Sequence, residues 1–195
     1  PAIPHNAPNN IVRVNSTQRP VLEPPQVTKL GHLVLEAADF DASARWYMDT
    51  LGFIPSDIMC LPDGTPVGCF MRLDRGDAPS DHHTLFVALG LEPGVDHAAF
   101  EVVDIDAVEM GQQVMYANKY RHAWGVGRHL LGSQIFDYWR DPWGQKHEHY
   151  ADGDLFDAES LAQFVGILEN FAAVMIIPVA WLFAHPLAFF LLFHE

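Results

Sequence analysis

The sequence has few cysteines and few basic residues, and both shortages restrict what it can do. Only two of its 195 residues are cysteines, Cys60 and Cys69, and no CxxC motif occurs, so neither a disulfide framework nor a structural zinc site is expected. Eleven Lys and Arg stand against twenty-five Asp and Glu, giving a formal net charge of -14. No nucleic-acid partner is expected, because a phosphate backbone requires a basic surface. The scarcity of cysteine fits a reducing, cytoplasmic location.

The two ends of the chain differ in composition from its middle. Residues 1–26 carry six prolines and lack both an apolar period and the basic start of a secretory signal, which predicts an extended arm or linker. Residues 171–193 contain no Asp, Glu, Lys or Arg and are long enough for a membrane span. Pro178 and Pro186 interrupt this run, so residues 156–195 are interpreted as an apolar tail that packs on the body or on a partner subunit. We therefore expect a homo-oligomer rather than a membrane protein; a truncated terminus is the third interpretation.

An internal repeat is the most informative feature of the sequence. Identical residues recur at five positions with a spacing of 65, namely His32, Glu36, Asp39, Asp41 and Ala42 in the first copy and His97, Glu101, Asp104, Asp106 and Ala107 in the second. Each copy predicts a strand, a helix that begins after an aspartate cap, and three further strands. The expected body, residues 27–155, is an α+β fold of two paired βαβββ modules, about 27–90 and 93–152, with a shared cleft.

The predicted elements follow the same order in both copies. In the first copy, strands are expected at 30–36, 53–59, 68–73 and 83–89, with a helix between Asp39 and Gly52. In the second copy, a strand at 95–102 precedes a helix capped by Asp104, and strands follow near 121–124, 134–140 and 145–150. This arrangement places His32 and His97 at matching positions of the two first strands.

Four positions related by the repeat carry side chains that can bind a metal. His32 and His97 are followed, each 51 residues later, by His83 and Glu148. Two histidines and one carboxylate form the facial triad of non-haem Fe(II) oxygenases, which leaves coordination positions open for substrate and dioxygen. The spacing alone does not say which three of the four would be ligands.

Strand alternation narrows the choice among neighbouring histidines. If Glu148 points inward, His147 and His149 point outward and are expected on the surface. The same argument excludes His82, the neighbour of His83. Tyr138, on the preceding strand, has a phenol that can donate or accept in a polar cleft, although a core aromatic is equally compatible with its position.

Several motifs in combination resemble a known enzyme family. They are Leu30–Leu35 with Gly31-His32, His82–Leu85, Asp96-His97, and Phe136–Gly144 followed by Glu148-His149-Tyr150. Together they resemble the extradiol ring-cleavage dioxygenases of the vicinal-oxygen-chelate superfamily, and most closely the catalytic C-terminal half of the catechol and 2,3-dihydroxybiphenyl type. The resemblance covers about residues 20–155 and implies that the two modules form a half-open barrel.

The resemblance also implies roles for individual residues. It implies that His32, His97 and Glu148 ligate Fe(II), and that His83 is an acid/base beside the dioxygen site. Tyr138 and His129, the latter in a loop that matches the family, would hydrogen-bond a catechol-type diol. The implied reaction cleaves the ring next to the vicinal diol with O2.

The sequence differs from the family in two respects, and two alternative functions remain open. The non-catalytic N-terminal half is absent, so the chain is expected to be a fragment or a one-domain version, and the apolar tail has no match in the family. A glyoxalase-like isomerase or lyase would use more carboxylates at the four repeat-related positions, where His83 counts against it. If the protein were a non-catalytic binding or resistance module, His32, His97 and Glu148 would occupy these positions by chance.

Overall fold

The computed structural model describes residues 4–166 of the chain. The apolar run 171–193, for which the sequence left a tail and a membrane span open, lies outside these residues. Among the described residues, no helix combines the length and the apolar character that crossing a membrane requires.

The first module follows the predicted order of elements. It contains β1 (Val27–Ala37), α1 (Phe40–Leu51), β2 (Phe53–Cys60), β3 (Pro66–Leu73), the two-residue β4 (Ser80–Asp81) and β5 (Leu85–Leu89). The Asp39 side chain accepts a hydrogen bond from the Ala42 N–H and so begins α1. Gly52 ends the helix at a φ of 71°, a left-handed conformation that glycine adopts without strain.

The second module repeats this order. It contains β6 (Gly94–Val102), α2 (Ile105–Ala117), β7 (Arg121–Arg128), β8 (Ile135–Arg140) and β9 (Lys146–Ala151), and β10 (Leu155–Phe156) and β11 (Gln163–Gly166) follow it. Asp104 caps α2 through the Ala107 N–H, as Asp39 caps α1. The sequence repeat therefore corresponds to a repeat of structure.

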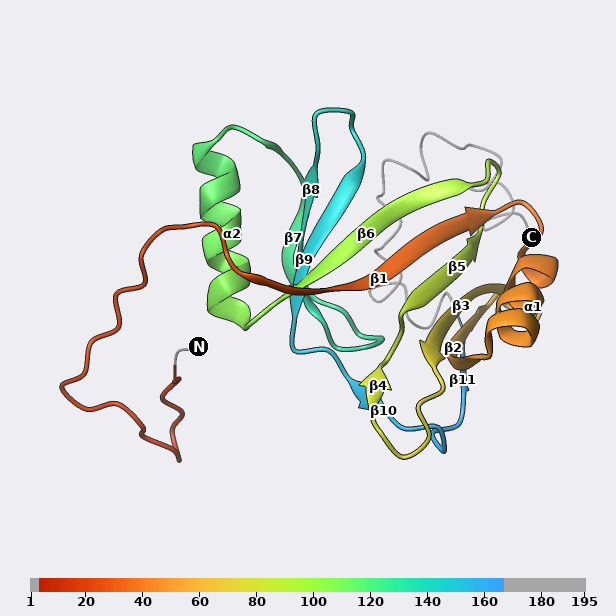
Figure 1. Cartoon of the computed structure of the whole chain (residues 1–195), viewed down its shortest axis with the longest axis horizontal. Coiled ribbons are helices and arrows are strands. Elements are labelled where there is room, and N and C mark those ends of the chain that lie inside the picture. Colours follow the sequence, from red (N-terminus) through yellow and green to blue (C-terminus); the bar gives the residue numbers. More distant parts are fainter. Residues whose placement is uncertain (1–3, 167–195) are drawn as a thin grey trace.

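The two modules form one mixed sheet of nine strands, in the order β11-β2-β3-β5-β1-β6-β9-β8-β7. They meet at its centre, where β1 and β6 pair in antiparallel fashion, and each of these strands has a parallel neighbour from its own module, β5 or β9. Figure 1 shows α1 and α2 at opposite ends of this sheet. The predicted α+β fold of paired βαβββ modules is confirmed. The half-open barrel stays a prediction, because strand pairing alone does not give the curvature of the sheet.

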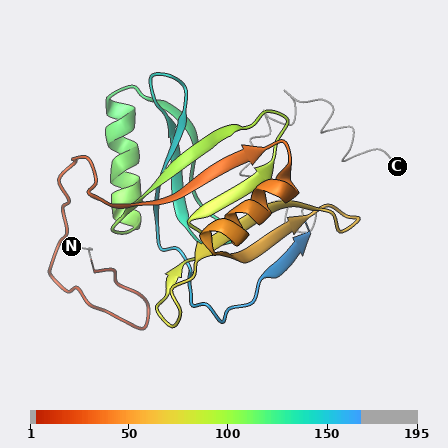
Figure 2. The ribbon, with the colours of Figure 1, turned by 45° about the vertical axis from the view of Figure 1, so that its right-hand side comes forward.

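Each helix covers an apolar core of its own module. Phe40 and Ala44 of α1 pack with Met71, Leu85 and Val87 of the sheet, and Figure 2 shows α1 lying over these strands. The second core joins α2 to the sheet through Ala107, Val108, Val102, Ile135 and Ala151. The two helices pack on these two cores, and the histidines near the β1–β6 junction belong to neither core.

The segment after β9 returns to the first module. Its β10 pairs with β4, and β11 adds to the sheet edge beside β2. The fully buried guanidinium of Arg72 donates to the carbonyl oxygens of Asp157 and Ser160 and to the Ser56 hydroxyl. The Arg72 side chain thereby attaches the C-terminal segment to β2 and β3.

Candidate metal centre

The pairing of the three strands β1, β6 and β9 brings Glu148, the candidate carboxylate ligand, close to His32. His32 on β1 lies opposite Ala99 on β6, and Ala99 lies opposite Glu148 on β9. Side chains of paired residues point to the same face of a sheet. The small Ala99 side chain between them is fully buried and lets the longer His32 and Glu148 side chains meet above it.

His97 joins the same face two residues before Ala99. It lies opposite Val34, so His32 and His97 flank the junction of the two modules on one side of the sheet. His32, His97 and Glu148 are 4%, 1% and 0% exposed, which places the whole group inside the protein. One ligand atom from each of the three lies within 4.8 Å of the others.

Three of the facing atoms of this cluster lack hydrogen-bond partners among the described residues. Nε2 of His32 and Nε2 of His97 lie 3.1 and 3.4 Å from Oε2 of Glu148. Within residues 4–166, neither Glu148 oxygen and not Nε2 of His97 has a partner in hydrogen-bond geometry. Leaving buried polar atoms unpaired costs about 1–3 kcal/mol each, so such a group is unusual in a folded protein unless it serves a ligand.

The charges of the cluster respond to one another. Burial would raise the pKa of Glu148, but contacts with His129, His32 and His97 outweigh it and hold the pKa well below its usual range. Burial lowers the pKa of His32, whereas hydrogen bonding to Asp96 and the contact with Glu148 raise the pKa of His97 despite its burial. The carboxylate is therefore ionised, the form in which it binds cations.

A carboxylate fixes the orientation of His97. Asp96 accepts from Nδ1 of His97 at 2.7 Å and is itself paired with Nζ of Lys146 at 2.8 Å. This bond turns Nε2 of His97 toward Glu148, as in the carboxylate–histidine–metal arrangements of known sites. His32 has no such support, since its Nδ1 is buried and unpaired within the described part of the chain.

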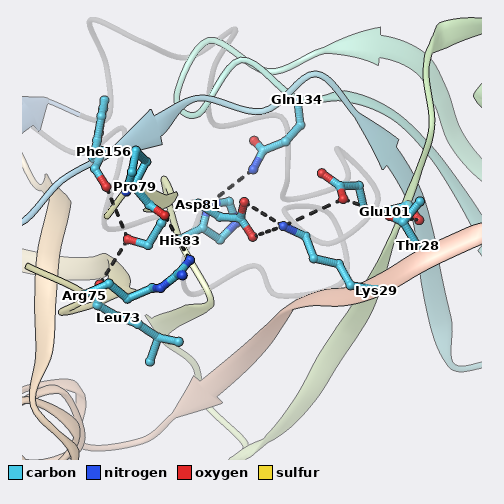
Figure 3. Close-up of polar contacts among 11 residues, drawn as sticks. Thr28, Lys29, Leu73, Arg75, Pro79, Asp81, His83, Glu101, Gln134 and Phe156 are labelled. Atoms are coloured by element: carbon cyan, nitrogen blue, oxygen red, sulfur yellow. Dashed lines mark hydrogen bonds and ion pairs between the residues drawn. The ribbon is translucent and has the colours of Figure 1, made fainter. Parts of the chain in front are cut away.

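His83 lies against this group without belonging to the three. Its ring centroid is 4.1 Å from that of His32, and Figure 3 shows the Gln134 amide directed toward it. Burial and the neighbouring charges of His32 and His82 hold the pKa of His83 well below its usual value. The imidazole is therefore neutral and can accept a proton.

The strand register corrects one step of the sequence argument. The repeat aligns Val34 with Ala99, and the residues opposite them are Phe86 and Glu148. Phe86, not His83, therefore occupies the place that corresponds to Glu148. His83 comes three residues earlier than Phe86, between β4 and β5. The spacing of 51 residues fails here because the number of residues between the first strand and its parallel neighbour differs between the two modules.

Tyr138 and His129 line the side of Glu148 away from His32. Tyr138 lies opposite Glu148 in the β8–β9 ladder, and its hydroxyl is 3.0 Å from Nε2 of His129. The His129 ring stacks on Phe136 at 4.0 Å, and its Nε2 lies 3.7 Å from Oε1 of Glu148. Burial raises the pKa of Tyr138 well above its usual value, so the phenol keeps its proton.

Two expectations about neighbouring histidines are wrong. His82 does not point away from His83: neither residue lies in a strand, so alternation does not apply, and His82 is only 1% exposed. His147 and His149 do lie on the face opposite Glu148, but they are half-buried rather than on the surface. His149 packs close to Gly111 of α2, which covers that face.

The sequence argument also missed three polar residues that surround the site. Asp96 precedes a candidate ligand directly, and this adjacency could have identified it as its support. Asp57 and Gln134 come near His82 and His83 only through the pairing of distant segments. No local pattern marks either of them.

A groove of about 420 Å³ lies against the other face of β8 and β9. Trp139, His147 and His149 line it together with Phe100 and Met115. Glu148 also belongs to its lining, between His147 and His149 on β9.

Comparison with known proteins identifies a family and several relatives. Residues 29–148 match the family model described as Glyoxalase/Bleomycin resistance protein/Dioxygenase superfamily. Metapyrocatechase 2 of Cupriavidus necator is 35% identical over 130 residues, which is 67% of this chain and 38% of that protein. The iron-dependent extradiol dioxygenase of Rhodococcus jostii (strain RHA1) is 31% identical over 139 residues, 67% of this chain and 45% of that protein.

Solved structures agree with the architecture. The homoprotocatechuate 2,3-dioxygenase of Arthrobacter globiformis superposes with a TM-score of 0.66 at 21% identity, over 80% of this chain and 48% of that one. The Mn(II)-bound glyoxalase of Novosphingobium aromaticivorans gives a TM-score of 0.65 at 23% identity, with the same coverage. The chain spans less than half the length of the curated relatives it matches.

Proposed function

This chain belongs to the Glyoxalase/Bleomycin resistance protein/Dioxygenase superfamily, and we propose that it carries the catalytic site of an Fe(II)-dependent extradiol dioxygenase. The catalytic part is residues 27–155, and the substrates are a catechol-type diol and O2. The observation that carries the proposal is the buried convergence of His32, His97 and Glu148, in which Nε2 of His97 and both Glu148 oxygens have no hydrogen-bond partner among the described residues. The 31–35% identity to two proteins named as ring-cleaving dioxygenases supports the choice of reaction.

The donor set fits divalent iron. Two neutral imidazoles and one carboxylate are the ligand types of non-haem Fe(II) oxygenases and leave positions open for other ligands. Bound there, the ion would act as a Lewis acid that lowers the pKa of a diol hydroxyl and brings diol and O2 together. His32, His97 and Glu148 would hold it.

The surrounding side chains supply hydrogen bonds and proton acceptors. Tyr138, whose phenol stays protonated, donates to one oxygen of the diol, and His129 binds the same side of the substrate. His83, neutral and beside His32, accepts a proton during oxygen addition and returns it on ring opening. Low exposure of all six side chains, 0–8%, excludes bulk water from these steps.

The register argues against a glyoxalase-like isomerase as the alternative. Such an enzyme is expected to use more carboxylates at the positions related by the repeat, yet the residue that corresponds to Glu148 is the apolar Phe86. A non-catalytic module would have no reason to bury two histidines and a glutamate with Nε2 of His97 and both Glu148 oxygens left without hydrogen-bond partners in the described part of the chain. Both alternatives are decided by the experiment below.

The full chain should be loaded with Fe(II) under anaerobic conditions and its metal content measured. It is then mixed with oxygenated buffer and a panel of catechols. We expect about one iron per chain, O2 consumption that depends on the diol, and a ring-opened product that contains both atoms of labelled O2. Conversion of substrate without O2 uptake would favour the isomerase, and failure to bind any divalent metal would favour the non-catalytic module.

We also propose that the protein is cytoplasmic and forms a homo-oligomer. Cys60 and Cys69 are buried free thiols, as is usual in a reducing cytoplasm. Leu161 and Phe164 are exposed on and beside the edge strand β11, which suits contact with a second copy in a homo-oligomer. Light scattering of the full chain at several concentrations tests the assembly.

A further inference from the structure

A chain of three buried polar side chains leads away from the metal cluster into the first module. Nδ1 of His83 lies 3.0 Å from Nδ1 of His82, and Nε2 of His82 lies 2.7 Å from Oδ2 of Asp57 on β2. Asp57, His82 and His83 are 6%, 1% and 4% exposed. Burying a carboxylate and two imidazoles is unfavourable unless their hydrogen bonds are made in a defined geometry.

We propose that Asp57 and His82 are positioning residues that orient the His83 ring and fix its tautomer. In this arrangement His83 carries its proton on Nδ1 and presents the lone pair of Nε2 as the proton acceptor of the site. The inference rests on the proposed function, because it assigns how the acid/base residue of that reaction is held. It concerns His82, which strand alternation would have excluded.

The direction of the hydrogen bonds follows from the end of the chain. A carboxylate can only accept, so Nε2 of His82 must donate to Asp57. In a neutral His82 the other nitrogen, Nδ1, then has no proton and must accept from Nδ1–H of His83. An imidazole with one proton on Nδ1 has its free lone pair on Nε2.

Gln134 contacts the same nitrogen from the second module, and one of the two orientations of its amide agrees with this assignment. Its amide lies 3.4 Å from Nδ1 of His83 through the nitrogen, while its Oε1 is buried without a hydrogen bond in the described part of the chain. The two ends of an amide exchange by a simple rotation of the group. Rotated, the Gln134 oxygen would share the His83 Nδ1–H with Nδ1 of His82, the nearer acceptor at 3.0 Å.

The surroundings hold the intermediate residue in place. The backbone N–H of His82 donates to the carbonyl of Asp154 at 2.8 Å, which joins the histidine loop to the C-terminal segment. The His82 ring packs against those of Phe70 and Phe156, each with a centroid distance of 5.4 Å. His82 therefore cannot turn to solvent without breaking this packing, and the orientation is passed on to His83.

The test uses two substitutions at position 82 that differ in one property. His82→Asn keeps an acceptor near the place of Nδ1 but loses the link to Asp57, whereas His82→Leu removes both. The tautomer of His83 is read from the ¹⁵N shifts of its imidazole in the metal-free full chain. His122→Gln is the control, because His122 makes a bond of the same length, 2.7 Å, to the buried Asp137 but does not reach the cluster.

In the native chain and in His122→Gln, the Nδ1–H form of His83 should dominate. His82→Leu should give a mixture with the Nε2–H form, and His82→Asn should restore the native tautomer. In the iron-loaded chain we expect unchanged metal content, with a kcat/KM about 10–100-fold lower for His82→Leu and a smaller loss for His82→Asn. An unchanged His83 tautomer in His82→Leu, or loss of its iron, would overturn the inference.

Asp57→Asn keeps the test decisive should His82→Leu fail to fold. Its amide nearly matches the shape of the carboxylate but can also donate to His82, which removes the fixed direction of the chain. The His83 tautomer should then be mixed, and a native tautomer would contradict the proposal. Because the NMR measurement requires neither iron nor catechol, absence of dioxygenase activity would count against the proposed function alone.

Discussion

The two modules share one frame but differ at the place where the chemistry would occur. In the second module, Tyr138 and Glu148 lie opposite each other across β8 and β9. The corresponding pair in the first module is Phe70 and Phe86, whose rings stack at a centroid distance of 4.1 Å. One copy of the repeat therefore uses this position for apolar packing, and the other uses it for a buried carboxylate. The features that the two modules share form the sheet, and the residues in which they differ form the candidate metal site.

The residue before each histidine shows the same kind of difference. Asp96 precedes His97 and holds its ring, whereas Gly31 precedes His32 and has no side chain. The ring of Tyr150 packs over Gly31 in the space that a side chain would need. The two histidines thus lie at equivalent positions but are held by different means, one by a carboxylate and one by packing.

The largest effect is expected from removing the carboxylate that only one module has. Glu148→Gln replaces the single charged ligand with a neutral amide, so the divalent metal bound per chain should fall from about one to near zero, and catechol cleavage should fall with it. Metal analysis after dialysis and O2 uptake measure the two quantities. Retention of stoichiometric iron by this variant would exclude Glu148 as a ligand.

The converse change introduces a carboxylate into the first module. Phe86→Glu should not create a second metal site, because Phe86 is 5% exposed and packs on Phe70. A buried charge without a prepared partner should lower the free energy of unfolding by about 3–5 kcal/mol, which urea denaturation of the metal-free chain would detect.

Phe86→Leu is the control for that experiment, since it removes the ring without adding a charge and should destabilise less. Equal stability of the two variants, with a second metal bound to Phe86→Glu, would show that the modules are chemically interchangeable.

The sequence predicted the frame better than the details of the site. The spacing of His32 and His97 and the caps at Asp39 and Asp104 depend on local patterns and on repetition, and the structure reproduces them. The residue of the first module that corresponds to Glu148 could not be found from a constant spacing, because the two modules differ in the number of residues between their strands. The structure shows Phe86 at that position, whereas the spacing predicted His83.

The polar chain that ends at Asp57 escaped for a different reason. Strand alternation predicts the direction of side chains only inside a strand, and His82 and His83 lie between two strands. There the backbone turns both rings inward, and the partner of His82 comes from a residue 25 positions earlier. Only the tertiary pairing brings these groups together.

A smaller effect is expected where the support of one histidine is weakened. Asp96→Asn keeps the size of the side chain but removes the charge that faces Nδ1 of His97 and Nζ of Lys146. The affinity for divalent metal should fall about 10–100-fold, the usual consequence of losing such a support. Competition with a chelator of known affinity measures it.

Asp41→Asn is the matched control for Asp96→Asn, because Asp41 pairs with Arg45 on the exposed side of α1 and lies away from the cluster. Its metal affinity should be native. Should both variants bind metal equally well, the hydrogen bond from His97 to Asp96 would have no part in holding the ion.

The smallest effect tests the packing that takes the place of a carboxylate beside His32. In Gly31→Ala, the added Cβ would overlap the ring and hydroxyl of Tyr150, which is 2% exposed and lies with its ring centroid 5.2 Å from that of His32. Overpacking of this kind should lower the free energy of unfolding by about 1–3 kcal/mol in urea denaturation.

Gly94→Ala on β6 is the control, because a Cβ there meets nothing within 4 Å and should change stability little. Since the Tyr150 ring contacts the His32 ring, Gly31→Ala should also weaken metal binding while Gly94→Ala does not. Equal stability of the two alanine variants would mean that the Tyr150 ring does not support the first histidine, and the contrast between the two modules would then rest on Asp96 and Glu148 alone.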